Sequence, residues 1–151
     1  MHHLPILRLK PGKEQSVKRY HPWVFSGAVK GLENSGLKDG ELVAVHDSND
    51  NFLALGHYHS GSIAVRIVSY SKEIPDDKFW ANKIARAWQL RIAIGLADSA
   101  DTTAFRLVHG ESDGLPGLII DIYNSTAVLQ AHTLAMYNLR PVIVKALQEV
   151  M

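Results

Sequence analysis

Residues 41–70, ELVAVHDSNDNFLALGHYHSGSIAVRIVSY, decide the fold of the first half of the chain. Polar and apolar side chains alternate through Glu41–His46, a period that is typical of a half-buried strand. Turn-forming residues fill positions 47–51, and two further apolar runs then span Phe52–Tyr58 and Ile63–Tyr70. The stretch therefore predicts three strands that are joined by short turns.

The residues before this stretch add two more short strands. Ile6–Leu9 is followed by the turn signal Pro11-Gly12, and Trp23–Phe25 is followed by Ser26-Gly27. A set of about five short strands with Gly, Asp and Asn turns is typical of a small barrel. We therefore expect residues 1–75 to form a small β-barrel.

The period of the apolar side chains changes at Pro75. Residues 76–95 carry them at helical spacing, which predicts one amphipathic helix. Later segments predict three strands and a second helix, at Phe105–His109, Leu118–Tyr123, Ala127–His132 and Met136–Met151. Residues 76–151 should thus form an α+β module, a three-stranded antiparallel sheet with flanking helices, and the fold class is α+β.

The composition is that of a folded protein without cysteine. Hydrophobic residues make up 46% of the chain and charged residues 21%, which argues against disorder. We find neither a continuous apolar stretch of membrane-spanning length nor a secretory signal, so we expect a cytoplasmic protein without a membrane partner. Because the chain stops inside a predicted helix, we also expect it to be a fragment of a longer protein.

Positive charge is concentrated near the beginning of the chain. Residues 1–30 carry six basic side chains against Glu14 alone, although the whole chain has a net charge of only +1. Lys18 and Arg19 lie close to Trp23, a mixture in which cations attract phosphates and rings stack on bases. A phosphate-bearing partner and a solvated, flexible terminus are both compatible with this block.

Short motifs for nucleotide and metal binding are missing. No two glycines lie two positions apart, so GxGxxG is absent, and Gly12-Lys13 lacks the Ser or Thr of a P-loop. Asp47 begins a segment with the spacing of EF-hand ligands, but Phe52 stands where that loop needs glycine, so we interpret the segment as a turn. His57 and His59 should share one face of a strand, but no third ligand is clustered with them, so we predict no metal site.

Two carboxylates, Glu111 and Asp113, lie in a loop rich in Gly and Pro. Together with His109 they could perform acid–base chemistry, which defines a small hydrolase as an alternative function. We favour a structural role, because Asp and Ser side chains often bond to backbone N–H groups in turns. Asp121 interrupts an apolar strand, and if its side chain points inward it needs a cation, for which Arg106 on the neighbouring strand is the nearest candidate.

Several segments together resemble a known family. HPWVFSGA at 21–28 and RLVHGESDGLPGLIIDIY at 106–123 are similar to two signatures of a bacterial family of S-adenosylmethionine-dependent methyltransferases of large-subunit ribosomal RNA. GHY at 56–58 and SIAVR at 62–66 match the family pattern between them. The resemblance covers essentially the whole chain and departs from the pattern at 59–61, where members often carry an Asn-Pro turn.

This resemblance implies a protein of three parts. Residues 1–75 resemble its RNA-binding PUA domain and residues 76–151 its central α+β domain, so we expect the chain to be truncated before the methyltransferase domain. Members methylate carbon 5 of a cytosine, after a cysteine thiolate adds to carbon 6. Because this chain lacks cysteine and a cofactor loop, we expect it to hold no catalytic residue and no cofactor, with S-adenosylmethionine bound by the parent protein.

The main hypothesis is that the chain is the RNA-recognition part of such an enzyme. The residues expected to contact RNA are Lys18, Arg19, His21 and Arg66. Those expected to hold the 110–117 loop or to line the pocket of the target base are Arg106, Glu111, Asp113 and Asp121. The expected partners are ribosomal RNA and the chain's own methyltransferase domain, with a homodimer left open. A protein-interaction module without an RNA role is a further alternative.

Overall fold

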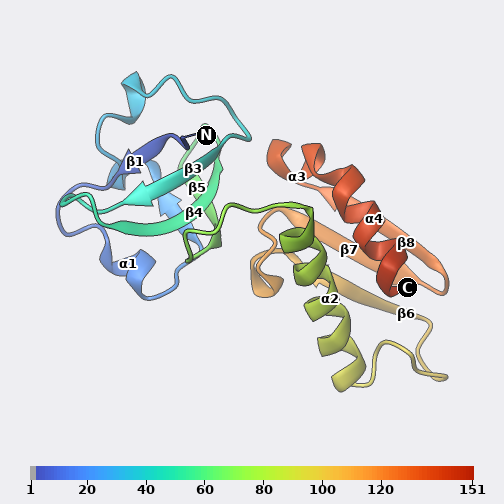
Figure 1. Cartoon of the computed structure of the whole chain (residues 1–151). Coiled ribbons are helices and arrows are strands. Elements are labelled where there is room, and N and C mark those ends of the chain that lie inside the picture. Colours follow the sequence, from blue (N-terminus) through green and yellow to red (C-terminus); the bar gives the residue numbers. More distant parts are fainter. Residues whose placement is uncertain (1–2) are drawn as a thin grey trace. The chain divides into compact units, whose positions relative to one another are not determined.

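The structure is a computed structural model that describes residues 3–151 (Figure 1). The chain divides into two compact units, and the boundary falls between Ile74 and Pro75. The first unit is built mainly from strands, and the second combines three strands with helices. The predicted α+β fold class is confirmed.

The first unit contains a curled five-stranded sheet. Its strands are β1 (Ile6–Arg8), β2 (Trp23–Phe25), β3 (Leu42–His46), β4 (Phe52–Tyr58) and β5 (Ile63–Ser69). They lie in the order β1-β3-β4-β5-β2, in which only the β1–β3 pair is parallel. The five predicted strands are therefore all present, with ends that differ by one residue at most.

Backbone hydrogen bonds bring the segments that follow the two edge strands together. Leu9 and Val29 form an isolated antiparallel bridge, the N–H of Lys10 donates to the carbonyl of Ala28 (2.8 Å), and the N–H of Lys30 donates to that of Arg8 (2.9 Å). These bonds draw the sheet into a half-barrel around an apolar core. The side chains of this core include Leu9, Val17, Val24, Val43, Val45 and Val65.

A short helix, α1 (Gln15–Lys18), lies in a segment for which the sequence predicted no regular structure. Its single buried side chain is Val17, which packs into the core of the half-barrel. One apolar side chain in four residues gives no recognisable helical period, and so α1 was missed. Its position matters because it ends at Lys18 and Arg19, two cations of the basic block.

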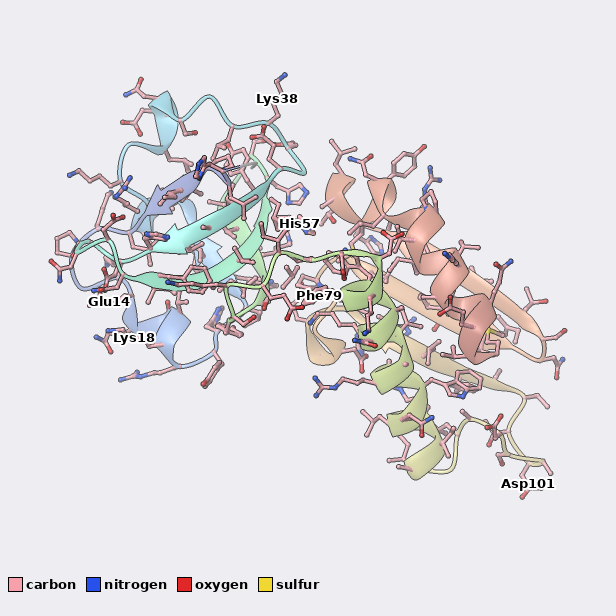
Figure 2. All side chains as sticks on the ribbon, in the orientation of Figure 1. Glu14, Lys18, Lys38, His57, Phe79 and Asp101 are labelled. Atoms are coloured by element: carbon pink, nitrogen blue, oxygen red, sulfur yellow. The ribbon has the colours of Figure 1, made fainter. Side chains whose placement is uncertain are left out.

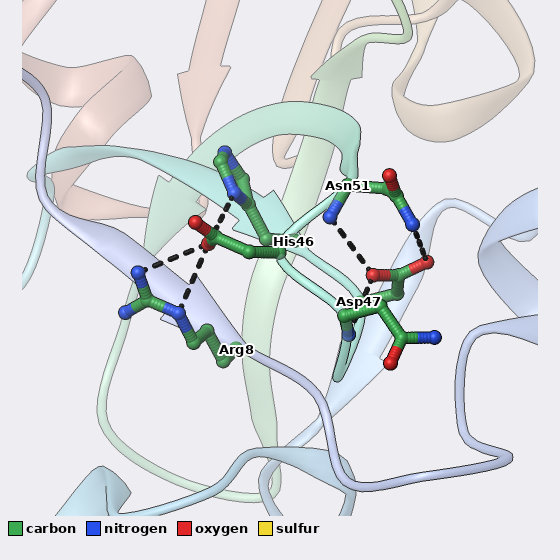
Figure 3. Close-up of polar contacts among 6 residues, drawn as sticks. Arg8, His46, Asp47 and Asn51 are labelled. Carbon is green, nitrogen blue, oxygen red and sulfur yellow. Dashed lines mark hydrogen bonds and ion pairs between the residues drawn. The ribbon is translucent and has the colours of Figure 1, made fainter.

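The β3–β4 connection confirms the interpretation of Asp47 as a turn residue (Figure 3). The carboxylate of Asp47 accepts hydrogen bonds from the backbone N–H groups of Asn49 and Asn51, both at 2.9 Å, and from the side-chain amide of Asn51 at 3.0 Å. Asp50, in the left-handed conformation at φ 66°, accepts from the guanidinium of Arg8 at 3.0 Å. The carboxylate of Asp47 thus holds the turn itself, and that of Asp50 ties the turn to β1.

The second unit packs helices against a three-stranded antiparallel sheet (Figure 1). Its elements are α2 (Asp77–Ala93), β6 (Ala104–His109), β7 (Leu118–Tyr123), β8 (Thr126–Ala131), α3 (Leu134–Asn138) and α4 (Arg140–Val150). The strand order is β6-β7-β8, and α2 packs against α4. Within β7, Leu118, Ile120 and Ile122 are buried and alternate with more exposed residues.

Side-chain caps define where α2 and α3 begin. The carboxylate of Asp76 accepts from the N–H of Phe79 at 2.8 Å, as expected of an acidic residue at a helix N-terminus. The single helix predicted at 136–151 is instead two helices, separated at Leu139. Thr133 begins the first by accepting from the N–H of Met136, and Pro141 lies in the first turn of the second, where a missing N–H costs nothing.

Within residues 3–151, every helix is too short or too polar to cross a membrane.

The close approach of β4 to β5 predicts a stability effect at Gly56. A Cβ atom on Gly56 would lie 2.5 Å from the carbonyl oxygen of Arg66 and 2.5 Å from Cγ1 of Val65. We expect Gly56→Ala to lower the free energy of unfolding by roughly 1–3 kcal/mol, because the strands must separate. Urea unfolding, followed by the NMR signals of first-unit amides, measures this change.

Gly27→Ala is the matched control, because a Cβ there meets no atom within 4 Å. We expect it to change the free energy of unfolding by no more than about 0.5 kcal/mol. Equal stability of the two variants would contradict the close β4–β5 contact.

Candidate nucleic-acid interface

The α1–β2 surface, defined as Lys18, Arg19, Tyr20, His21, Trp23 and Phe25, carries most of the predicted RNA-contact residues. Helix α1 ends at Lys18, and Tyr20 then takes the left-handed conformation at φ 64°. The N–H of Tyr20 donates to the carbonyl of Val17 (2.9 Å), and that of His21 to the carbonyl of Ser16 (2.9 Å). These bonds close the end of the helix and fix the direction in which the chain enters β2.

Aromatic rings gather on this surface. The ring of Phe25 lies 6.1 Å from that of His21 and 6.3 Å from that of Trp23, between centroids. Tyr20 meets Tyr70 edge to face at 4.9 Å. Tyr20 is 72% exposed and Phe25 is 49% exposed, so both present ring surface to solvent. Such rings can stack on unpaired bases.

Strand alternation decides which side chains of β2 enter the core of the half-barrel. Val24 occupies the core, and the side chains before and after it in β2 point to the other face of the strand. Trp23 is half-buried and Phe25 is exposed. Trp23 and Phe25 thus lie outside the core cluster, because strand alternation gives the interior to Val24.

Cations border the rings. Lys18 and Arg19 are both exposed, and Figure 2 shows the side chain of Lys18 extending outward from α1. Neither residue forms an ion pair with a carboxylate in the part of the chain that the structure describes. Their charges are therefore available to an anionic partner.

His21 and Arg66 are placed by neighbouring backbone. Nδ1 of His21 lies 3.1 Å from the backbone nitrogen and 3.2 Å from the carbonyl oxygen of Trp23, so the backbone of Trp23 holds the ring in place. Arg66 lies directly opposite Trp23 in the β2–β5 register and is half-buried. The structure thus places all four predicted RNA-contact residues near β2, with Arg66 less accessible than Lys18 and Arg19.

A cavity of about 370 Å³ lies beside these residues, between α1 and β2. It is lined by Lys13, Ser16, Val17, Val24, Phe25, Gly27 and Ala28. Sequence reasoning did not single out Lys13 and Ser16, because they become neighbours of β2 only when the unpredicted helix α1 folds. An ammonium, a hydroxyl and a ring at one apolar cavity suit a nucleotide more than an apolar ligand.

In the second unit, Asp113 is held by a residue that the sequence analysis missed. Arg91 on α2 donates from Nη1 to Oδ1 and from Nη2 to Oδ2 of Asp113, both at 2.8 Å, and the N–H of His109 donates to Oδ2 at 2.7 Å. The two side chains are only 10% and 5% exposed. The sequence did carry a signal for the burial of Arg91: it lies seven residues after Ile84, on the apolar face of the helix.

The predicted partnership of Arg106 with Asp121 is confirmed. The two residues lie opposite each other in the β6–β7 register, with Nε 2.8 Å from Oδ1 and Nη2 3.1 Å from Oδ2. The bond from Arg106 lowers the pKa of Asp121 and keeps the carboxyl ionised. Both side chains lie on the face opposite the buried Ile120 and Ile122, so this pair supports the sheet.

The geometry gives little support to a hydrolase built on His109, Glu111 and Asp113. Both oxygens of Asp113 bind Arg91, so this carboxylate is committed to structure. The cavity beside the loop is lined by Asp113 but by neither of the other two residues. The preference for a structural role of Asp113 is consistent with these contacts.

The paired histidines at the end of β4 lie in a buried environment. His57 and His59 are each 8% exposed. Burial, with a smaller contribution from the charge of His59, lowers the pKa of His57 to about 4. Among the residues that the structure describes, no cluster of three or more His, Cys, Asp or Glu side chains could hold a metal ion.

Comparison with known proteins shows that the chain is similar to parts of longer enzymes. Residues 7–70 match the model of a PUA-like domain. Over 94% of its length the chain is 40% identical to ribosomal RNA large subunit methyltransferase I of Erwinia tasmaniensis, and over 95% it is 39% identical to that of Shewanella amazonensis. The chain spans about a third of the length of these relatives, 36% in both cases.

Solved structures share the fold. A chain from Streptococcus mutans, described as a SAM-dependent methyltransferase, superposes with a TM-score of 0.81 at 22% identity over 96% of this chain and 37% of its own length. A structure with the same scores is described as a methyltransferase complexed with SAH. At this level of identity the likeness shows the fold.

The buried Arg91–Asp113 pair predicts a large cost on breaking it. Arg91→Met leaves the carboxylate of Asp113 in a buried place without its cation, so we expect a loss of roughly 3–5 kcal/mol in the free energy of unfolding. Arg106→Met is the matched comparison, because the side chain of Arg106 is 46% exposed, and should cost about 1 kcal/mol or less. Urea unfolding of the second unit measures both, and equal costs would argue against the buried pair.

The buried His57 predicts a dependence of stability on pH. In the unfolded chain its imidazole gains a proton near pH 6.5, whereas in the folded chain it does so only near pH 4. The unfolded state therefore binds more protons between these values, and the free energy of unfolding should fall by up to about 3 kcal/mol as the pH is lowered through this window. His57→Gln should flatten the dependence in unfolding experiments at pH 7 and pH 4.5, and an unchanged slope would contradict the assignment.

Proposed function

We propose that this chain recognises RNA as part of a methyltransferase of large-subunit ribosomal RNA. The observation that carries the proposal is the α1–β2 surface, where exposed rings lie beside the exposed cations Lys18 and Arg19. This surface lies within the residues that match a PUA-like domain. The likeness of the chain to methyltransferases of ribosomal RNA suggests that the nucleic acid is ribosomal RNA.

The chemistry of the surface favours single-stranded or locally unpaired RNA. Lys18 and Arg19 attract backbone phosphates, which gives affinity without sequence preference. Tyr20 and Phe25 can stack on bases only where the bases are unpaired. His21 adds a ring N–H that can donate to a phosphate or to a base edge. Arg66, on the neighbouring strand β5, would contact the same RNA strand.

The methyl transfer itself belongs to residues outside this chain. Activation of carbon 5 of cytosine by covalent addition needs a thiolate, and the chain has no cysteine. We propose that S-adenosylmethionine binds to a separate methyltransferase domain of the parent protein, the expected partner of the second unit. The target would be a cytosine of ribosomal RNA, which also implies a cytoplasmic location.

We propose a supporting role for the second unit. Arg91 fixes Asp113, and through it the 110–114 loop, while Arg106 and Asp121 stiffen the sheet from which this loop extends. Glu111 lies in the same loop and would share this role. A preformed wall of this kind would help to receive a base that has been drawn out of structured RNA.

RNA binding across a salt series tests the proposal. We expect binding of a single-stranded RNA to weaken steeply as salt is raised, because phosphate contacts release counterions. A DNA duplex of the same length serves as competitor and should bind more weakly. Absence of RNA binding at low salt would place recognition outside this chain and overturn the proposal.

Charge reversal at the end of α1 gives the sharper prediction. Lys18→Glu with Arg19→Glu should weaken RNA binding by at least about ten-fold at low salt and reduce the salt slope by roughly one to two. Lys38→Glu is the matched control, because Lys38 lies at the opposite end of the first unit in Figure 2. Equal losses in the two variants would indicate general electrostatic attraction.

Phe25→Ala separates stacking from charge. Because Phe25 is half exposed and outside the core cluster, its removal should leave the fold intact. Loss of one base-stacking contact weakens binding by roughly 1–3 kcal/mol, with the salt slope unchanged. Fluorescence anisotropy with a labelled RNA measures both quantities.

A further inference from the structure

A second cationic site lies in the other unit, far along the chain from the α1–β2 surface. A cavity of about 350 Å³ opens between one face of α2 and the 112–114 segment. Helix α2 contributes Lys83, Arg86, Ala87 and Leu90, which recur at one-turn spacing. The loop contributes Ser112, Asp113 and Gly114. We call this the α2–loop pocket.

Glycine brings the ammonium of Lys83 close to the loop backbone. Gly114 has φ 69°, and a Cβ atom there would lie only 2.9 Å from Nζ of Lys83. The absence of a side chain thus lets the ammonium lie over the loop. The same Nζ lies 5.1 Å from the centroid of the Phe79 ring, which further fixes its direction.

Positive charge in this pocket is not neutralised by its own carboxylate. Asp113 lines the pocket, but both of its oxygens receive hydrogen bonds from Arg91, and one also receives the N–H of His109. The Arg91–Asp113 pair is therefore neutral as a unit. Across residues 3–151, no ion pair joins Lys83 or Arg86 to an acidic side chain.

The energetics of Lys83 agree with this geometry. Burial lowers the pKa of Lys83, and the neighbouring charge of Arg86 lowers it further. A half-buried ammonium beside a second cation costs free energy that a bound anion would return. Ser112 adds a hydroxyl that can donate to such an anion.

We propose that the α2–loop pocket binds a phosphate group, held by Lys83, Arg86 and the hydroxyl of Ser112. Two cations one helical turn apart match the charge of a phosphate better than that of a carboxylate. The cavity exceeds the size of a bare phosphate, so it can also accept the sugar to which a phosphate ester is attached. The phosphate can come from a free nucleotide or from an RNA backbone, and the residues recognise the same chemistry in both.

NMR titration of the whole isotope-labelled chain tests the proposal. The ligands are inorganic phosphate, uridine monophosphate and a short single-stranded RNA, with sodium chloride at matched ionic strength as the blank. We expect saturable shifts of the Ser112 and Gly114 amides. Shifts with the monophosphate as well as the RNA identify a free phosphate ester as sufficient, whereas shifts with the RNA alone identify a backbone phosphate, and either supports the site. No saturable shift with any ligand overturns it.

Variants distinguish this pocket from general attraction and from the RNA surface of the first unit. Lys83→Gln and Arg86→Gln should each lower the affinity for the phosphate ligand about ten-fold. Because Arg86 is exposed, its substitution disturbs folding less than that of Lys83. Lys145→Gln, an exposed cation on α4 outside this pocket, is the matched control. An equal loss in the control overturns the proposal. Reversal of Lys18 and Arg19 should leave the Ser112 and Gly114 shifts intact, so the two proposals can fail separately.

Discussion

The buried ion pair between Arg91 and Asp113 organises the second unit. It joins the last turns of α2 to the loop that follows β6, and a third hydrogen bond, from the N–H of His109, ties the same carboxylate to the end of the strand. A buried carboxylate is tolerated only when its charge and its lone pairs are satisfied. Helix, strand and loop must therefore adopt one mutual arrangement, and the α2–loop pocket is a consequence of it.

The distribution of charge suits the two units to different ways of binding phosphate. In the first unit, exposed cations border exposed rings, a combination suited to a flexible strand of RNA. In the second unit, the half-buried Lys83 and the exposed Arg86 meet a loop whose own carboxylate is already neutralised, a combination suited to one defined anion. Both would recognise phosphate, but with different degrees of preorganisation.

The half-barrel shows how strand alternation assigns roles to neighbouring residues. Val24 enters the core, whereas Trp23 and Phe25 present rings on the outer side of the same three-residue strand. Since Trp23 lies opposite Arg66 in the register, one short strand aligns a ring with a cation on the neighbouring strand. Addition of one residue before Trp23 would exchange these faces and dismantle the surface.

The sequence by itself determined the strands, the long helix and their division near Pro75, because alternation, apolar periodicity and turn formers are local signals. It also determined the Arg106–Asp121 pair, since adjacent antiparallel strands place few candidates opposite each other. It could not reveal α1, whose four residues bury one side chain, or the separation of α3 from α4 at Leu139. Only the tertiary structure decided that Arg91 neutralises Asp113 and that Lys83 and Arg86 meet the loop, because residues some twenty to thirty positions apart in the sequence become neighbours only when α2 packs on the sheet.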